Sequence, residues 1–255
     1  VGPREFVKHI RTGGFTKEEF ADAIHKSLQR LQTDYIDLYQ LHWPERTSNF
    51  FGVRGYTHDE AEKWSDNFNE VLGYLNNFKK EGKIREIGLS NETPYGVMRY
   101  VEEARKGAPK MITVQNPYNL LNRKDEIGLT EVLHRENVGH FPYSPLGFGQ
   151  LTGKYLDDNP KDDRVTLFPQ FSRYHNDISF KATRAYNEIA KKHGISLTQM
   201  ALAFVNERPF VTSNIIGATS LTQLEENIGS INITLSDTIL KEIEAVHEQI
   251  PNPAP

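Results

Sequence analysis

Five short apolar runs of the chain each end in residues that can form hydrogen bonds or let a ligand approach closely. The segments at these ends are Leu41-His42-Trp43-Pro44, Gly88-Leu89-Ser90-Asn91, Val114-Gln115-Asn116-Pro117, Tyr143-Ser144-Pro145-Leu146-Gly147 and Ile216-Gly217-Ala218-Thr219-Ser220. Polar side chains scattered over a surface would not recur at the same place in five elements. We therefore treat the five ends as one candidate site.

His42 shares its strand parity with Gln40 and Leu38. A histidine at the end of a strand can donate a hydrogen bond to a carbonyl oxygen and help polarise the carbonyl for hydride attack. The structural alternative is a hydrogen-bonded core histidine, which is the commoner case when His42 is considered without the other strand ends.

Ser90, Asn91 and Gln115 are neutral hydrogen-bonding residues. They suit an uncharged amide such as the carboxamide of nicotinamide. Their alternative use is to satisfy loop backbone at the end of a sheet. Tyr143 could stack on a planar ring, although filling a core is the commoner use of such a side chain.

Gly147 and Gly149 allow backbone to approach a ligand closely. The segment Gly147-Phe148-Gly149-Gln150-Leu151-Thr152 lacks the third glycine of the dinucleotide fingerprint, so it does not predict a Rossmann fold. Gly217-Ala218-Thr219-Ser220 leads into a helix, where backbone amides suit a phosphate. When that segment is considered alone, an ordinary cap by Thr219 or Ser220 is the favoured explanation.

The elements that must position these ends alternate along the chain. We expect helices at 16–31, 66–81, 94–106, 126–136, 180–193, 196–206 and 221–230, then one capped by Ser236, and strands at 35–42, 84–90, 111–116, 138–144 and 211–216. Ser196 is the predicted cap of the helix at 196–206. Thr16-Lys17-Glu18-Glu19 forms a capping box. The alternation predicts a parallel sheet, in which sites gather at the carboxyl ends of strands. A doubly wound sheet and a β/α barrel both fit this pattern.

Three segments are expected to be irregular. Residues 44–63 and 146–179 lack a clear period and are predicted to be long loops, the first of them a candidate substrate wall from its position. Pro142 lies inside the fourth predicted strand, where it removes a ladder hydrogen bond.

Composition narrows the function classes. The chain has 255 residues, a net charge of −4 and no cysteine. These values give no basic bias toward nucleic acid or an anionic membrane, and they exclude disulfides and thiolate chemistry. The histidines show no metal-binding spacing, and no apolar run is long enough to span a membrane. We expect a soluble, cytoplasmic protein whose residues 1–255 belong to one domain.

Taken together, several segments resemble the aldo-keto reductase superfamily, with the closest likeness to its bacterial Tas-type branch. The segments are Ser27-Leu28-Gln29-Arg30-Leu31-Gln32-Thr33-Asp34-Tyr35-Ile36-Asp37-Leu38, Leu41-His42-Trp43-Pro44, Gly82-Lys83-Ile84-Arg85-Glu86-Ile87-Gly88-Leu89-Ser90-Asn91, Gln115-Asn116-Pro117-Tyr118, Tyr143-Ser144-Pro145-Leu146-Gly147, Leu151-Thr152-Gly153-Lys154-Tyr155, and Gly217-Ala218-Thr219 with Gln223, Glu226 and Asn227.

The resemblance implies a (β/α)8 TIM barrel that binds NADPH or NADP+ without a Rossmann domain and reduces small carbonyl substrates. It implies that His42 is the catalytic histidine and that Ser90, Asn91 and Gln115 bind the nicotinamide carboxamide. It also implies that Tyr143 stacks under the nicotinamide ring. The remaining implied contacts are Ser144, Leu146, Gly147, Gly149, Leu151 and Lys154 at the pyrophosphate, Gly217, Thr219, Gln223, Glu226 and Asn227 at the adenosine with its 2′-phosphate, and Arg173 at that phosphate.

The chain also departs from the family pattern. The family's catalytic Asp, Tyr and Lys come from the first three β/α units, which have no counterpart here. The five predicted strands would be strands 4 to 8, with about 90 residues missing. We therefore expect no reductase activity from these 255 residues alone. The main alternative is a non-catalytic NADP(H)-binding regulatory subunit that resembles potassium-channel beta subunits. An unrelated barrel lyase or isomerase fits less well, because metal-ligand carboxylates are missing at the strand ends.

Overall fold

The structure is a computed structural model that describes residues 14–49, 51–157 and 163–255. These residues divide into two compact units. Unit 1 holds the described residues of the ranges 1–50, 55–115 and 128–140, and unit 2 holds those of 51–54, 116–127 and 141–255. Each unit has a hydrophobic core of its own.

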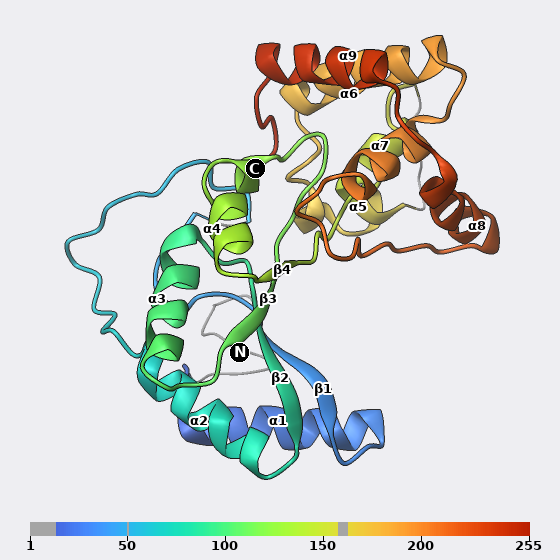
Figure 1. The fold of residues 1–255 in the computed structure, drawn as a ribbon. Coiled ribbons are helices and arrows are strands. Elements are labelled where there is room, and N and C mark those ends of the chain that lie inside the picture. The colour runs from blue at the N-terminus through green and yellow to red at the C-terminus, as the bar shows by residue number, and fades with distance from the viewer. Residues whose placement is uncertain (1–13, 50, 158–162) are drawn as a thin grey trace. The chain divides into compact units, whose positions relative to one another are not determined.

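Unit 1 is a parallel sheet with helices in the crossovers (Figure 1). Its elements are α1 (Lys17–Leu31), β1 (Ile36–Leu41), α2 (Phe68–Lys80), β2 (Ile84–Ser90), α3 (Pro94–Arg105), β3 (Met111–Gln115), α4 (Leu129–Arg135) and β4 (Gly139–His140). The strand order β1-β2-β3-β4 follows the sequence without reversal. Because right-handed crossovers that all step in one direction put their helices on one face, this order is typical of a barrel wall and not of a doubly wound sheet.

The helices of unit 1 begin where the sequence predicts. The Thr16 side chain accepts a hydrogen bond from the Glu19 N–H at the start of α1, and Thr93 does the same for Gly96 at the start of α3. Such caps satisfy amide groups that have no partner within the helix. The predicted helices at 16–31, 66–81 and 94–106 are confirmed to within about two residues.

The core of unit 1 lies between these helices and one face of the sheet. Phe20 and Ile24 of α1 and Leu72 of α2 are buried in one cluster with Ile87 and Leu89 of β2. The opposite face carries a polar row in which the Gln40 side chain passes over Gly88 and donates to the carbonyl of Leu89. The sheet is thus apolar toward its helices, while Gln40 and Thr113 lie beside Gly88 on the other face.

The fourth predicted strand, 138–144, is wrong in its extent. Only Gly139 and His140 form β4, and the chain pairs again at Tyr143 through isolated bridges to Pro117 and Ile215. Pro142 lies between the two paired points and has no N–H to donate. The boundary between the two units also falls in this segment, between His140 and Phe141.

The fifth predicted strand, 211–216, is wrong as a strand. Its described pairing is the single bridge between Ile215 and Tyr143, with the Ile215 N–H donating to the carbonyl of Pro142. The segment that it meets is interrupted at Pro142, so a longer ladder has no regular partner. The described sheet therefore has four strands where five were expected.

Unit 2 is built mainly from helices. Its elements are the 3-10 turns η2 (Lys124–Glu126), η3 (Gly147–Thr152), η4 (Pro169–Phe171) and η5 (Ser230–Asn232), and the helices α5 (Arg164–Leu167), α6 (Asp177–Lys192), α7 (Leu197–Asn206), α8 (Leu221–Gly229) and α9 (Asp237–Gln249). Ser196 and Ser236 cap α7 and α9 as predicted. The predicted loop 146–179 is wrong in part, because it contains η3, α5 and η4.

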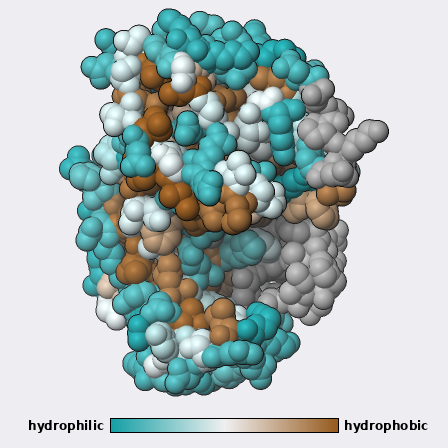
Figure 2. All heavy atoms as spheres, turned by 90° about the vertical axis from the view of Figure 1, so that its right-hand side faces the viewer, coloured by the Kyte–Doolittle hydropathy of each residue, from teal (hydrophilic) through white to brown (hydrophobic). Residues whose placement is uncertain are grey.

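Helix α8 leaves apolar side chains at the surface. Leu221, Leu224 and Ile228 are exposed and share one face of the helix. Figure 2 shows apolar atoms in brown among hydrophilic ones in teal on the face that it views. Within the described residues, no helix has the length and apolar character needed to cross a membrane.

Candidate active site

The ends of β1, β2 and β3 bring four of the predicted site residues together in unit 1. The Asn91 carboxamide donates to the backbone carbonyl of His42 over 2.7 Å and to the Ser90 hydroxyl over 3.1 Å. The carbonyl of Gln115 accepts from the Ser90 hydroxyl over 2.7 Å and from the Asn91 N–H over 3.0 Å. The predicted meeting of these strand ends is therefore present, and hydrogen bonds across three neighbouring strands fix it.

Asn91 owes its central position to its backbone. Its φ is 52°, in the left-handed region that asparagine tolerates better than most residues. This conformation turns the chain out of β2 and lets the side chain reach back to the end of β1. Ser90 and Asn91 are both buried, so their polar atoms depend on these bonds.

The residue after Asn91, Glu92, belongs to a buried ion pair with Arg46. Arg46, from the loop after β1, donates to Glu92 over 3.2 Å and to the Thr93 hydroxyl over 3.0 Å. Burial alone would lower the pKa of Arg46, but the charge and hydrogen bonds of Glu92 raise the pKa above its ordinary value. This pair is not among the residues predicted from the sequence, because its members lie 46 positions apart. It ties the predicted substrate loop 44–63 to the end of β2.

His42 itself is exposed at the end of β1 and packs against Trp43, with ring centroids 4.3 Å apart. The surrounding residues remove part of its water and thereby lower the pKa of His42 below its ordinary value. An imidazole with a lowered pKa is neutral at neutral pH and can still donate one hydrogen bond. This state suits the polarisation of a carbonyl.

In unit 2, Tyr143 and Ser144 are held by the segment that follows β3. The Tyr143 N–H donates to the carbonyl of Asn116 over 2.9 Å, and the Tyr118 N–H donates to the carbonyl of Tyr143 over 3.3 Å. The Asn119 side chain donates to the carbonyl of Ser144 over 2.8 Å. Burial raises the pKa of Tyr143 to about 12, so this phenol stays protonated at neutral pH.

The chain beyond Tyr143 turns sharply. Ser144, Gly147, Phe148 and Gly149 all have positive φ. A β-carbon at Gly149 would lie 2.9 Å from Cε of Lys154, so glycine permits the close approach of that side chain. The predicted pyrophosphate residues from Ser144 to Lys154 thus belong to one tightly wound segment, in which Leu151 is fully buried and Lys154 is exposed.

Arg173 gives the clearest test of whether unit 2 fits a phosphate. Its guanidinium lies 4.9 Å from the ring centroid of Tyr174, 5.2 Å from that of Phe148 and 6.0 Å from that of Tyr143. Burial would lower the pKa of Arg173, and the hydroxyls of Tyr174 and Tyr143 raise it above its ordinary value. Nε and Nη1 are buried without a hydrogen-bond partner in the described part of the chain. An anionic oxygen would satisfy these donors, so the site fits a phosphate.

The last predicted group surrounds the start of α8. Thr219 donates through its N–H and its hydroxyl to the Gln223 side chain, over 2.9 and 3.1 Å. The Asn227 side chain donates to the carbonyl of Gly217 over 3.0 Å. These four residues are therefore brought together. Glu226 is instead engaged by the hydroxyl of Ser196, the N-cap of α7.

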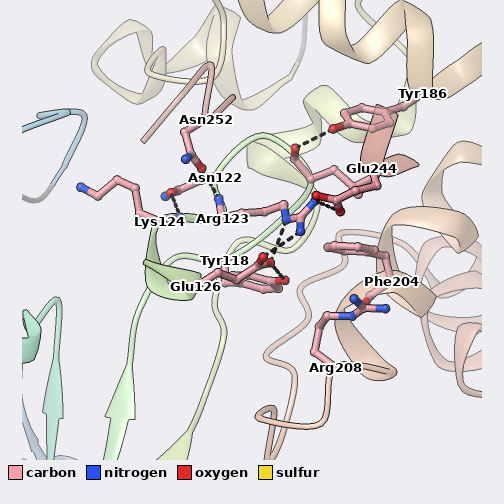
Figure 3. A network of polar contacts seen from close by, with 11 residues as sticks. Tyr118, Asn122, Arg123, Lys124, Glu126, Tyr186, Phe204, Arg208, Glu244 and Asn252 are labelled. Carbon is pink, nitrogen blue, oxygen red and sulfur yellow. Dashed lines mark hydrogen bonds and ion pairs between the residues drawn. The ribbon is translucent and has the colours of Figure 1, made fainter. Parts of the chain in front are cut away.

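The segment 116–127 is anchored within unit 2 by a network around the buried Arg123 (Figure 3). Arg123 pairs with Glu126 over 2.7 Å and with Glu244 of α9 over 2.8 Å. Its N–H donates to the Asn252 side chain over 2.6 Å. Leu120 and Leu121 of the same segment lie in the core with α7 and α9.

Comparisons with known proteins agree with the resemblance seen in the sequence. The model of the Aldo/keto reductase family matches residues 6–248. Protein tas of Escherichia coli strain K12 is 49% identical over 246 residues, which cover 94% of this chain and 69% of that protein. An aldo-keto reductase of Babesia bovis is 37% identical and covers 93% of this chain and 90% of its own length. L-glyceraldehyde 3-phosphate reductase of Escherichia coli strain K12 is 31% identical, with 91% of this chain and 64% of that protein covered.

Proposed function

Because the chain belongs to the aldo/keto reductase family, we propose that it contributes the cofactor site and the catalytic histidine to the NADPH-dependent reduction of aldehydes or ketones to alcohols. The observation that supports this proposal most is the hydrogen-bonded set of strand-end residues in unit 1, where Asn91 joins His42 to Ser90. Neutral amide and hydroxyl groups at this place suit a carboxamide, and a neutral imidazole beside them suits a carbonyl oxygen.

We assign the residues of unit 1 as follows. Ser90, Asn91 and Gln115 bind the nicotinamide carboxamide, and His42 donates a hydrogen bond to the substrate carbonyl oxygen. The cofactor, when bound, supplies the hydride. The lowered pKa of His42 supports a neutral donor at neutral pH, and the anchored backbone of His42 holds the ring at the strand end.

We assign two further roles to unit 2. Tyr143 stacks on the nicotinamide ring, while the wound segment with Ser144, Leu146, Gly147, Gly149, Leu151 and Lys154 binds the pyrophosphate. Gly217, Thr219, Gln223, Glu226, Asn227 and Arg173 bind the adenosine and its 2′-phosphate. Two buried donors of Arg173 have no hydrogen-bond partner within the described residues, which supports an anionic group of the cofactor at this place.

The same proposal extends to the fold. Residues 1–255 would supply about strands 4 to 8 of a (β/α)8 barrel and belong to a single domain. The unreversed strand order of unit 1 supports the barrel. A cytoplasmic location, expected from the sequence, stays a prediction.

Equilibrium binding tests the proposal directly. Titration of the protein with NADPH, followed by cofactor fluorescence, should give saturable binding that is tighter than for NADH. Arg173→Gln should weaken NADPH binding by about tenfold or more, since it removes a charge-assisted contact, and should change NADH binding by about twofold or less. Lys241→Gln, on the exposed surface of α9, is the matched control. A wild-type chain that binds neither cofactor would overturn the proposal.

The alternative is a non-catalytic NADP(H)-binding regulatory subunit resembling potassium-channel beta subunits. It predicts the same cofactor binding. The two functions separate in a turnover assay with aldehydes and ketones.

A further inference from the structure

Asn119 has no assigned role in the proposed site, yet its side chain is among the most buried polar groups in unit 2. Its exposed fraction is 0%, and both polar atoms of the carboxamide are bonded. Nδ2 donates to the carbonyl of Ser144 over 2.8 Å, and Oδ1 accepts from the Leu121 N–H over 2.8 Å. The residue therefore links the anchored segment 116–127 to the backbone just after Tyr143.

The contact replaces a strand pairing that cannot continue. Residues 116–118 pair with Tyr143 in parallel through two backbone hydrogen bonds. The ladder would need extended backbone at the next residue, but Ser144 has a φ of 56°. The Asn119 side chain reaches across and supplies the next hydrogen bond from a carboxamide. The same Ser144 carbonyl also accepts from the Gly147 N–H over 2.9 Å and so closes the following turn.

A left-handed serine is an uncommon conformation that the surrounding structure must hold in place. The described hydrogen bond to Ser144 from outside its own turn is the one from Asn119. The bond is fixed at its other end, because residues 120 and 121 lie in the core of unit 2. Asn119 is therefore placed to set the direction in which the chain leaves Tyr143.

We propose that Asn119 is a positioning residue, which holds Ser144 left-handed and thereby sets the Tyr143 ring and the Ser144–Gly147 turn for cofactor binding. The effect on binding rests on the proposed function. Asn119 contacts no cofactor in this role and acts through Ser144.

The chain offers a matched control in Asn122. It is as buried as Asn119 and lies on the same segment. Its side chain donates to the carbonyl of Pro117 and accepts from the Lys124 N–H, so these bonds stay within the segment. Asn122→Ala also removes a buried, hydrogen-bonded carboxamide, but it leaves the hydrogen bonds of Ser144 in place.

The first experiment is a double-mutant cycle on the dissociation constant for NADPH. Asn119→Ala should raise that constant about tenfold, while Asn122→Ala should change it by about twofold or less, at a temperature where both variants remain folded by circular dichroism. Ser144→Gly removes the steric cost of a positive φ at this position, because glycine adopts positive φ freely. The hydrogen bond from Asn119 is then no longer needed to hold the conformation. The effect of Asn119→Ala should therefore shrink in the Ser144→Gly background. An equal effect in both backgrounds, or an unchanged dissociation constant in the single variant, would overturn the proposal.

A second readout does not depend on the cofactor. Amide hydrogen exchange at Gly147 and Tyr118 reports the turn and the strand pairing beside Ser144. We expect about tenfold faster exchange at both amides in Asn119→Ala and no comparable change in Asn122→Ala. If wild-type protein binds no NADPH, the proposed function fails, and exchange alone decides the positioning role. Unchanged exchange at both amides would refute it.

Discussion

Asn91 is the residue on which the strand-end cluster of unit 1 depends most, because its carboxamide joins β1 to β2. Asn91→Asp replaces the donor that faces the His42 carbonyl by an oxygen. We expect a loss of about 1–3 kcal/mol in the free energy of unfolding, since a buried carbonyl loses its donor. Urea unfolding monitored by circular dichroism measures the loss.

Asn137→Asp is the control for this prediction. Asn137 has the same left-handed backbone, with a φ of 50°, but its side chain is exposed. The change should alter the free energy of unfolding by about 0.5 kcal/mol or less. Equal losses in the two variants would contradict the role given to the Asn91 hydrogen bonds.

The site residues that stand at a strand end could be predicted from the sequence. His42, Ser90 and Gln115 could be grouped because parallel strands end at one edge of a sheet. Arg46 could not, since its partner Glu92 lies 46 positions away and only the folded loop brings the two together. Asn119 was missed for a related reason, because its contact depends on the left-handed backbone of Ser144.

Among the elements, β2 carries a glycine that its neighbours require. A β-carbon at Gly88 would lie 2.3 Å from Oγ1 of Thr113 and 3.3 Å from the backbone carbonyl oxygen of that residue. We expect Gly88→Ala to lower the free energy of unfolding by about 1–3 kcal/mol through overpacking. Adding Thr113→Ala should recover part of the loss, because it removes the closest atom.

The control is Gly73→Ala on the exposed side of α2, where an added β-carbon meets no atom within 4 Å. Alanine is the better helix former, so this variant should be more stable by about 0.5–1 kcal/mol. Chemical denaturation should therefore give a lower free energy of unfolding for Gly88→Ala and a higher one for Gly73→Ala. Destabilisation of similar size at both positions would speak against a specific contact at Gly88.

Helix α9 brings a titrating group to the network around Arg123. Nδ1 of His247 is buried without a hydrogen-bond partner in the described residues. Burial lowers the pKa of His247, and Arg123 lowers it further, while Glu244 and Glu126 act in the opposite direction. The unfolded chain then binds this proton more readily than the folded chain does.

The sign of the pH effect follows from that difference. The stabilisation is present above the unfolded pKa of about 6.5 and is lost as the pH falls through the lower folded value. We expect the free energy of unfolding to decrease from pH 7 toward about pH 5, and His247→Gln to flatten this part of the profile. Urea titrations at several pH values measure it. The same slope in the variant would exclude His247 as the cause.

The starts of helices were predictable where a capping residue marks them. Thr16, Ser196 and Ser236 cap their helices as the sequence suggested. The predicted strands at 138–144 and 211–216 are wrong in extent or kind, because apolar content alone does not supply a regular pairing partner. Pro142 had signalled an irregular strand, but not that the ladder would shrink to isolated bridges on Tyr143.

For the molecule as a whole, the remaining question is the source of a proton. Hydride addition to a carbonyl leaves an alkoxide that needs an acid, and a positioned acid contributes about 10²–10⁴-fold to the rate. The resemblance to the family implies that this acid is a tyrosine, and no tyrosine of the 255 residues is predicted to take that role. Tyr143 is a poor substitute, because burial raises its pKa to about 12.

We therefore expect these 255 residues to bind NADPH without oxidising it in the presence of aldehydes. Loss of NADPH absorbance, followed over a panel of aldehydes and ketones, measures turnover. If proton donation is the missing step, a small exogenous acid such as phenol should raise the rate in proportion to its concentration, and His42→Ala should remove that increase. Turnover without added acid would mean that a residue of this chain supplies the proton, whereas binding that no acid can convert into turnover would favour the regulatory alternative.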